Sequence, residues 1–143
     1  KYKLYNTQLM KKLLGIVVMA LLWCNVGVAD LHTNLHKWTE FGNLEDNKGK
    51  YYVDKDSMVE DAGYLIFWKM VDFIEPIKST KYYSVRIFIK GDCKMNRIKS
   101  LVYVYYIGSK ATGESDIKES TDKRWKYPTP EKIDSIILSK LCL

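Results

Sequence analysis

Short runs of apolar and aromatic residues alternate with polar turns along most of this chain, and that pattern constrains the fold more than any other feature. Runs of roughly 5–10 residues are typical of β-strands. The turns between most of them are too short to hold a helical crossover, so neighbouring strands are expected to run largely antiparallel. The predicted strands are residues 36–41, 50–54, 64–73, 81–90 and 97–107, with a sixth at 123–127 after a surface loop at 108–122.

Only the end of the chain has the pattern of a helix. Thr129, Pro130 and Glu131 supply a capping residue, a proline suited to the first helical position and an acid in the first turn. The apolar residues that then recur at helical spacing are Ile133, Ile136, Ile137 and Leu141. We therefore expect an α+β fold, in which an antiparallel sheet of about six strands carries one C-terminal helix packed on one face.

The beginning of the chain has the order of a secretory signal peptide. Met10 and two lysines precede an apolar run at residues 13–22, and small residues lead up to a cleavage site at Ala29. The apolar run is well short of the ~20 residues that span a bilayer. We expect residues 1–29 to be an upstream extension and a cleaved signal peptide starting at Met10. Residues 30–143 would then form one exported domain without a transmembrane anchor, in the periplasm or on the outer cell surface.

The three cysteines have different expected fates. Lipidation of Cys24 is an alternative to cleavage after Ala29, but Trp23 stands where lipoprotein processing needs a small residue. The remaining pair, Cys93 and Cys142, is expected to form a disulfide, as two cysteines of an exported domain most often do. A zinc site is the alternative, but there is no CxxC motif and no nearby histidine. The bridge would close a loop of about 50 residues and tether the helix to the sheet, stabilising the fold by roughly 4 kcal/mol.

The net charge argues against a nucleic-acid partner once processing is considered. The whole sequence carries a formal charge of +6, from 23 basic and 17 acidic residues. Removal of residues 1–29 takes away four lysines and no acid, which leaves a net charge of only +2. So small a charge produces no long-range field for nucleic acid.

Short aromatic motifs and the two cysteines occur in an order that resembles the surface-adhesin protein E family. They are Trp38, Tyr51-Tyr52-Val53-Asp54 with Ser57, Phe67-Trp68-Lys69-Met70-Val71-Asp72, Asp92-Cys93, Arg97, Ser100-Leu101, Trp125, Pro128 and Cys142. The resemblance covers nearly all of residues 30–143, although residues 108–120 depart from the Met-Gly-containing stretch expected there. It implies an antiparallel sheet with a disulfide-fastened C-terminal helix and a tendency to dimerise. It also implies binding of host matrix proteins, at least in adhesive members.

Catalytic machinery is not evident in the sequence. The exported part contains only two histidines, His32 and His36, at or before the first strand, and no GxSxG, HExxH or phosphate-binding glycine loop. We interpret Asp54 and Asp56 as solvated turn acids and not as a pair of catalytic carboxylates. No enzyme activity, catalytic residue or cofactor is therefore predicted, although a small envelope enzyme of unknown reaction is kept as an alternative.

A metal site at the new amino terminus is the other alternative. Cleavage after Ala29 would expose Asp30-Leu31-His32, whose free amine, two amide nitrogens and imidazole suit square-planar Cu(II) or Ni(II). Asp30 and His32 are the predicted ligands. A periplasmic metal-handling protein is accordingly the second functional hypothesis.

The central strands are apolar and aromatic on both faces, whereas a sheet with one helix needs only one apolar face. Long loops or the amino-terminal arm offer one way to cover the second face. The alternative is a second copy of the chain or an extracellular protein ligand, because monomers rarely expose large apolar patches. We therefore predict a non-enzymatic, adhesin-like binding module of a Gram-negative envelope that forms a homodimer through this face or the sheet edge beside it. The candidate binding or dimer face comprises Tyr64, Trp68, Tyr103 and Tyr105.

Overall fold

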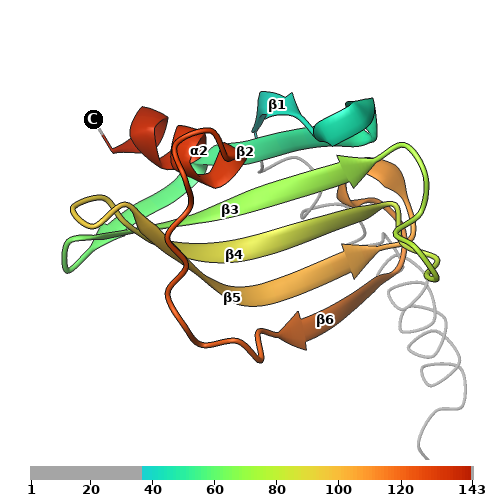
Figure 1. Ribbon diagram of the computed structural model, residues 1–143. Helices are drawn as coiled ribbons and strands as arrows, with labels where there is room; N and C mark the ends of the chain where they lie inside the picture. Colours follow the sequence, from blue (N-terminus) through green and yellow to red (C-terminus); the bar gives the residue numbers. More distant parts are fainter. Residues whose placement is uncertain (1–36, 143) are drawn as a thin grey trace, which may run out of the picture. The chain divides into compact units, whose positions relative to one another are not determined.

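The computed structural model describes residues 37–142, which form one six-stranded sheet with a helix at its C-terminal end (Figure 1). The strands follow one another in sequence order across the sheet, and each pairs antiparallel with its neighbours. The α+β prediction is confirmed. The elements are β1 (Trp38–Asn43), η1 (Glu45–Asn47), β2 (Gly49–Asp61), β3 (Tyr64–Phe73), β4 (Ser84–Asp92), β5 (Arg97–Tyr106), η2 (Ser109–Ala111), β6 (Ser115–Glu119) and α2 (Ile133–Leu141).

Most strands lie where the sequence predicts them. Strand β3 spans the predicted residues, and β1, β4 and β5 differ from the prediction by only a few residues at their ends. Strand β2 is much longer than predicted and runs to a tight hairpin at Ala62 and Gly63, whose φ angles of 49° and 80° are both positive. Positive φ at both central residues is the geometry of a type I′ turn, which matches the twist of the strands it joins.

The prediction for the sixth strand is wrong. Strand β6 lies at Ser115–Glu119, inside the segment predicted as a surface loop, whereas residues 123–127 contain only an isolated bridge between Lys126 and Ile98. All five residues of β6 are exposed, because it is the edge of the sheet. An edge strand with two solvated faces needs no apolar alternation, and charges protect it from pairing with other chains.

The helix also begins later than predicted. Its first residue is Ile133, while the preceding residues form a turn in which the Lys132 amide donates to the Thr129 carbonyl at 2.9 Å. The Thr129 hydroxyl donates to the Glu131 carboxylate at 2.6 Å and is not used as a helix cap. The residues predicted to start the helix therefore form their hydrogen bonds within this turn. The N-cap residue is the next one along the chain, Lys132.

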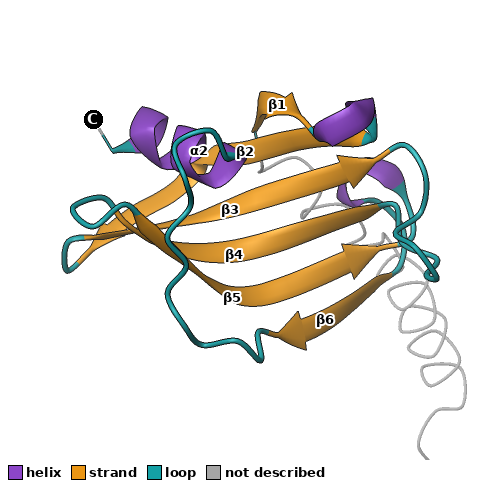
Figure 2. Ribbon diagram, viewed as in Figure 1, coloured by secondary structure: helices purple, strands orange, loops and turns teal. Residues whose placement is uncertain are grey.

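The helix covers one face of the sheet, which we call the helix face (Figure 2). Ile137 and Leu138 of α2 are 1% exposed and pack with strand residues that include Val53, Phe67 and Ile89 at 0–1% exposed. Gly91 permits the close approach, since a Cβ at that position would lie 2.7 Å from the Leu138 side chain. The hydrophobic core thus lies between α2 and the central strands.

A disulfide and an ion pair fasten the helix to the sheet. A disulfide joins Cys93, in the turn between β4 and β5, to Cys142 directly after α2, with the Cα atoms 5.6 Å apart. The predicted pairing is confirmed, and neither thiol is left for zinc. At the other end of α2, the Lys69 amino group of β3 lies 2.5 Å from the Asp134 carboxylate. The side chain of Lys69 is 8% exposed, so this ion pair belongs to the packed side of the sheet.

Candidate binding face

The face of the sheet opposite α2 carries aromatic rings interleaved with cations, and we call it the open face. The register places Trp68 of β3 beside Phe88 of β4, and Phe88 beside Val102 of β5. The two rings lie 4.8 Å apart between their centres. The rings and cations of this face include Trp38, Tyr64, Trp68, Phe88, Trp125, Arg86, Lys90, Arg97 and Lys99.

One end of the open face is built around Arg86 and two tryptophans, and we call it the tryptophan end. The guanidinium carbon of Arg86 lies 4.6 Å from the Trp68 ring centre and 5.4 Å from that of Trp38. These distances are within the range of cation–π attraction. Met70 and Val104, the cross-strand neighbours of Arg86, are 1% and 8% exposed. The rings and the arginine therefore enclose a small apolar layer on this side of the sheet.

The other end of the open face holds a stacked ring pair with three cations, and we call it the lysine end. The rings of Tyr64 and Trp125 lie 5.7 Å apart at an interplanar angle of 20°. The Lys90 amino group is 4.0 Å from the Tyr64 ring centre, while Lys99 and Arg97 lie 5.0 and 4.5 Å from that of Trp125. The residues at this end are half-buried, so they are ordered by packing yet reachable from solvent.

One carboxylate, that of Asp92, is paired within the lysine end. Arg97 donates through Nε to Asp92 at 2.8 Å, and the Met95 amide donates to the same carboxylate at 3.1 Å. Burial acts to raise the pKa of Asp92, but the hydrogen bonds from Arg97 and Met95 outweigh it and hold the pKa below the ordinary value. A hydrogen bond with the Tyr127 hydroxyl and the pairing with Asp92 together raise the pKa of Arg97.

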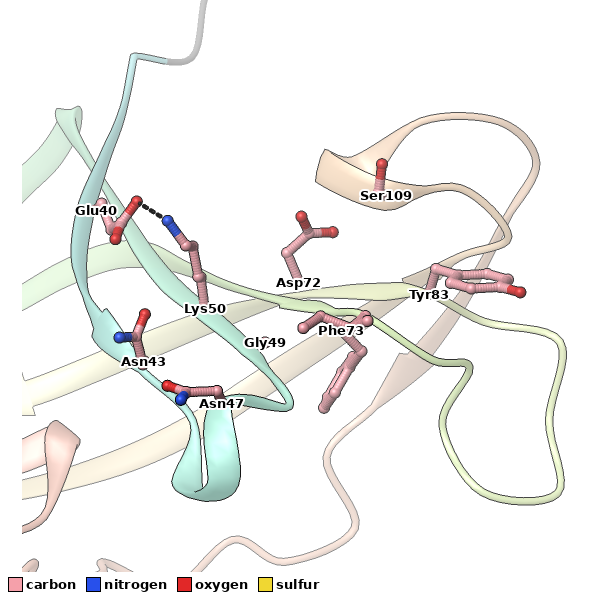
Figure 3. Close-up of a pocket in the computed structure, with 10 residues that line it drawn as sticks. Glu40, Asn43, Asn47, Gly49, Lys50, Asp72, Phe73, Tyr83 and Ser109 are labelled. Carbon is pink, nitrogen blue, oxygen red and sulfur yellow. Dashed lines mark hydrogen bonds and ion pairs between the residues drawn. The ribbon is translucent and has the colours of Figure 1, made fainter.

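A hollow of about 690 Å³ lies where β2 and β3 meet η1 and η2 (Figure 3). Lys50 pairs with Glu40 at 2.9 Å on one side of it, and this hydrogen bond raises the pKa of Lys50. The Asp72 carboxylate on the other side accepts a hydrogen bond from the Lys110 amide at 2.7 Å. The charged groups of this hollow are thus already engaged with one another or with the backbone.

The predicted face residues do not share one face. Tyr64 and Trp68 lie on the open face, but Tyr103 and Tyr105 pair with Ile87 and Val85 on the helix face. There the rings of Tyr82, Tyr105 and Tyr103 form a row, with centres 5.4 and 6.2 Å apart.

The cause is a bulge between β4 and β5. Phe88 pairs with Val102 while the next residue, Ile89, pairs with Ser100, so Leu101 is an extra residue on β5. One extra residue turns every later side chain to the opposite face. The alternation of side chains in the sequence does not indicate the bulge. The cations of the open face could have been predicted from the sequence, because Arg86 and Lys90 alternate in step with Phe88 along β4.

The interpretation of Asp54 as a solvated turn acid is also wrong. Asp54 lies within β2 at 0% exposed, between Trp38 and Trp68 in the sheet register. Its carboxylate accepts hydrogen bonds from the backbone amides of the two residues at positions 56 and 57, at 3.2 and 3.3 Å. These hydrogen bonds hold the irregular segment in which the register between β2 and β3 shifts. The side chain of Asp56 is exposed, as predicted.

The predicted metal ligands, Asp30 and His32, lie outside the described residues, as does His36. Within residues 37–142, no three His, Cys, Asp or Glu side chains come together in a group able to hold a metal ion. In the same part of the chain, no helix has the length and apolar character needed to cross a bilayer.

A single sheet that is closed on one face by its own tethered helix, and that carries rings and cations on the other, defines a small α+β module whose second face α2 does not cover. The sequence matches the family described as Surface-adhesin protein E over residues 38–143. The chain belongs to this family. No match is found among curated proteins.

The fold is similar to that of solved structures of protein E from Haemophilus influenzae. Crystal form II of that protein is 15% identical, with a TM-score of 0.59 and coverage of 72% of this chain and 86% of that one. A second structure of it is 16% identical, with a TM-score of 0.56 and coverage of 72% and 83%. At this identity the likeness establishes the shared fold, and the residues of the binding face must be argued from this chain itself.

Proposed function

We propose that this chain is an exported, non-enzymatic binding module of the bacterial cell surface, which engages an extracellular protein ligand through the open face of its sheet. The observation that carries the proposal is the row of half-buried rings and cations on the side that α2 does not cover. Aromatic residues and arginine are enriched at protein interfaces because they bury much area and keep a polar group for the rim. Membership of an adhesin family supports the same role.

Export and the absence of catalysis are part of the same proposal. The signal-peptide pattern of residues 1–29 supports export, and a surface location agrees with the family. The two shortest ion pairs of the described residues link one structural element to another: Lys69 joins Asp134 between β3 and α2, and Arg97 joins Asp92 across the β4–β5 hairpin. Groups engaged in this way stabilise the fold and do not converge on a reacting atom.

We also propose that the chain forms a homodimer through the open face. The tryptophan end suits it better than the lysine end, since a two-fold axis at the lysine end would bring like charges together. Light scattering of the full chain at micromolar concentration is expected to give twice the monomer mass. W68A, within the tryptophan end, should shift the chain toward monomer, whereas a monomeric wild-type chain would rule out this interface.

Location is tested on cells that produce the full chain. Brief trypsin treatment of intact cells should degrade the protein on the outer surface and leave a periplasmic control protein intact. Fractionation of the treated cells then shows where any remaining protein lies. If the protein resists trypsin until the outer membrane is opened, it is periplasmic and the adhesive role is excluded.

The binding face is tested with two pairs of neighbouring rings, one on each face of the sheet. Y64A/W125A removes the ring pair of the open face, whereas Y82A/Y105A removes a similar pair from the helix face, 5.4 Å between centres. Adhesion of cells to immobilised basement-membrane extract should fall with the first double variant and persist with the second, at equal surface amounts. Equal loss in both would remove the assignment to the open face.

A further inference from the structure

The lysine end contains a charge arrangement that the fold does not need. Lys90 of β4 and Lys99 of β5 stand directly opposite each other in the sheet register. Both side chains project to the open face, because their neighbours Ile89 and Ile98 belong to the core on the other side. Like charges directly opposite in an antiparallel pair destabilise a sheet. No residue within 37–142 forms an ion pair with either amino group, so the repulsion is not compensated there.

The two amino groups are also held in place. Lys90 lies over the Tyr64 ring at 4.0 Å and Lys99 over the Trp125 ring at 5.0 Å, and the two rings stack on each other. Cation–π contacts fix the position of an ammonium group and leave the N–H donors that point away from the ring available. Arg97 lies beside them, with part of its charge balanced by Asp92. An anion placed between the two lysines would therefore meet donors that are already ordered.

From this geometry we propose that the lysine end binds a sulfated, acidic polysaccharide. A sulfate group between Lys90 and Lys99 would remove their repulsion, and adjacent sugar units would contact the edges of the Tyr64 and Trp125 rings, whose faces already meet each other and the cations. The inference rests on the proposed surface location, since such polysaccharides are extracellular. The lysine end does not line the 690 Å³ hollow, which lies at the opposite end of the strands. A repeating, linear polyanion binds to charges that are spaced along an open surface, and it does not need a deep pocket.

Single-stranded nucleic acid is the competing polyanion, because it also combines phosphates with groups that stack on aromatic rings. The proposed export argues against it, because nucleic acid is mainly an intracellular polymer whereas sulfated polysaccharides lie outside the cell. It is therefore an outcome of the test and not part of the proposal.

The test is titration calorimetry of the full chain with a heparin dodecasaccharide, beside its desulfated counterpart and a dT12 oligonucleotide. K90Q/K99Q removes the opposed pair and keeps side chains of similar length in the strands. K78Q/K110Q removes the same charge from exposed positions at the opposite end of the strands. The wild type and the control should bind the sulfated probe, and K90Q/K99Q should bind at least ~10-fold more weakly with a smaller salt dependence. Melting curves confirm that each variant is folded.

Each contrary result has a defined meaning. Equal weakening in the two double variants would show diffuse attraction without a site, and binding of dT12 as tight as that of heparin would show a general polyanion surface. Both results overturn the inference, as does the absence of any binding. The proposed function is judged separately, because trypsin treatment of intact cells reports the location of the chain whether or not it binds a polysaccharide.

Discussion

The helix face and the open face of this sheet are both rich in apolar residues, yet they are completed in different ways. On the helix face, Phe67, Ile89 and Leu138 are 1% exposed and meet other apolar side chains of the same chain. On the open face, Trp68 and Phe88 remain half-buried beside Arg86, although no helix of residues 37–142 lies over them. Close apolar packing at nearly complete burial is what a self-contained core uses, whereas half-buried rings beside cations suit a surface that must remain soluble until it binds.

The largest expected contrast between the faces comes from two phenylalanines. F67A empties a fully buried position on the helix face and should destabilise the fold by about 3–5 kcal/mol, because a cavity remains in the core. F88A removes a half-buried ring from the open face and should cost only about 1 kcal/mol. Urea unfolding followed by circular dichroism measures both. Similar losses in the two variants would show that the open face is covered as fully as the core.

The disulfide provides the next contrast, because it acts on the helix face alone. C93A/C142A should lower the free energy of unfolding by about 2–4 kcal/mol, since the bridge spans 49 residues and restricts the unfolded chain. Thermal melting of this variant and of reduced wild type should show the same drop, while binding of ligand to the open face persists in the folded fraction. A melting temperature unaffected by reduction would mean that the core alone holds α2 in place.

A smaller effect is expected at the ion pair beneath α2. D134N leaves the Lys69 ammonium group buried with a weaker partner and should cost about 1–3 kcal/mol. K69M is the matched control, because methionine fills a similar volume and removes the buried charge itself, leaving Asp134 partly exposed to water. D134N should therefore be the less stable of the two in urea unfolding. The reverse order would show that the ammonium group is well solvated.

The smallest expected effect is the acid response of the open face. The pKa of Asp92 is lowered in the folded chain, so the stability that its ionised form contributes is complete above the ordinary value of 3.8 and is lost as pH falls below it. Urea midpoints of the wild type and of D92N should differ at pH 6 and approach each other as the pH falls below 3.8. A constant difference between the two proteins over this range would assign the role of Asp92 to packing.

The sequence predicts the elements that the core requires and misses those that it does not. Strand β3 could be located because its residues alternate between two apolar faces within clear turn signals, and the cysteine pairing followed from there being only two cysteines in the exported part. Strand β6 could not be located, since SDIKE is polar and exposed on both faces. The helix start was displaced because Thr129 and Glu131 bind each other in a turn.

The open face could be predicted only in part, because the pattern within one strand does not show how that strand pairs with its neighbours. Alternation within β3 correctly places Tyr64 and Trp68 together, but it cannot relate one strand to another across an irregular pairing. The extra residue Leu101 moves Tyr103 and Tyr105 to the helix face. Residues of the lysine end come from β3, β4, β5 and the segment after β6, and only their register shows that they meet.

The difference between the two faces is tested most directly by the rates at which individual lysines of the full chain react with an amine-specific acetylating reagent, read by mass spectrometry. We predict that Lys90 and Lys99 react at rates near that of the exposed Lys78, while Lys69 is strongly protected by α2 and Asp134. Addition of the heparin dodecasaccharide should then protect Lys90 and Lys99 and leave Lys78 unchanged. Protection of Lys90 and Lys99 in the free, monomeric chain would contradict the account, because it would mean that the chain covers its own second face.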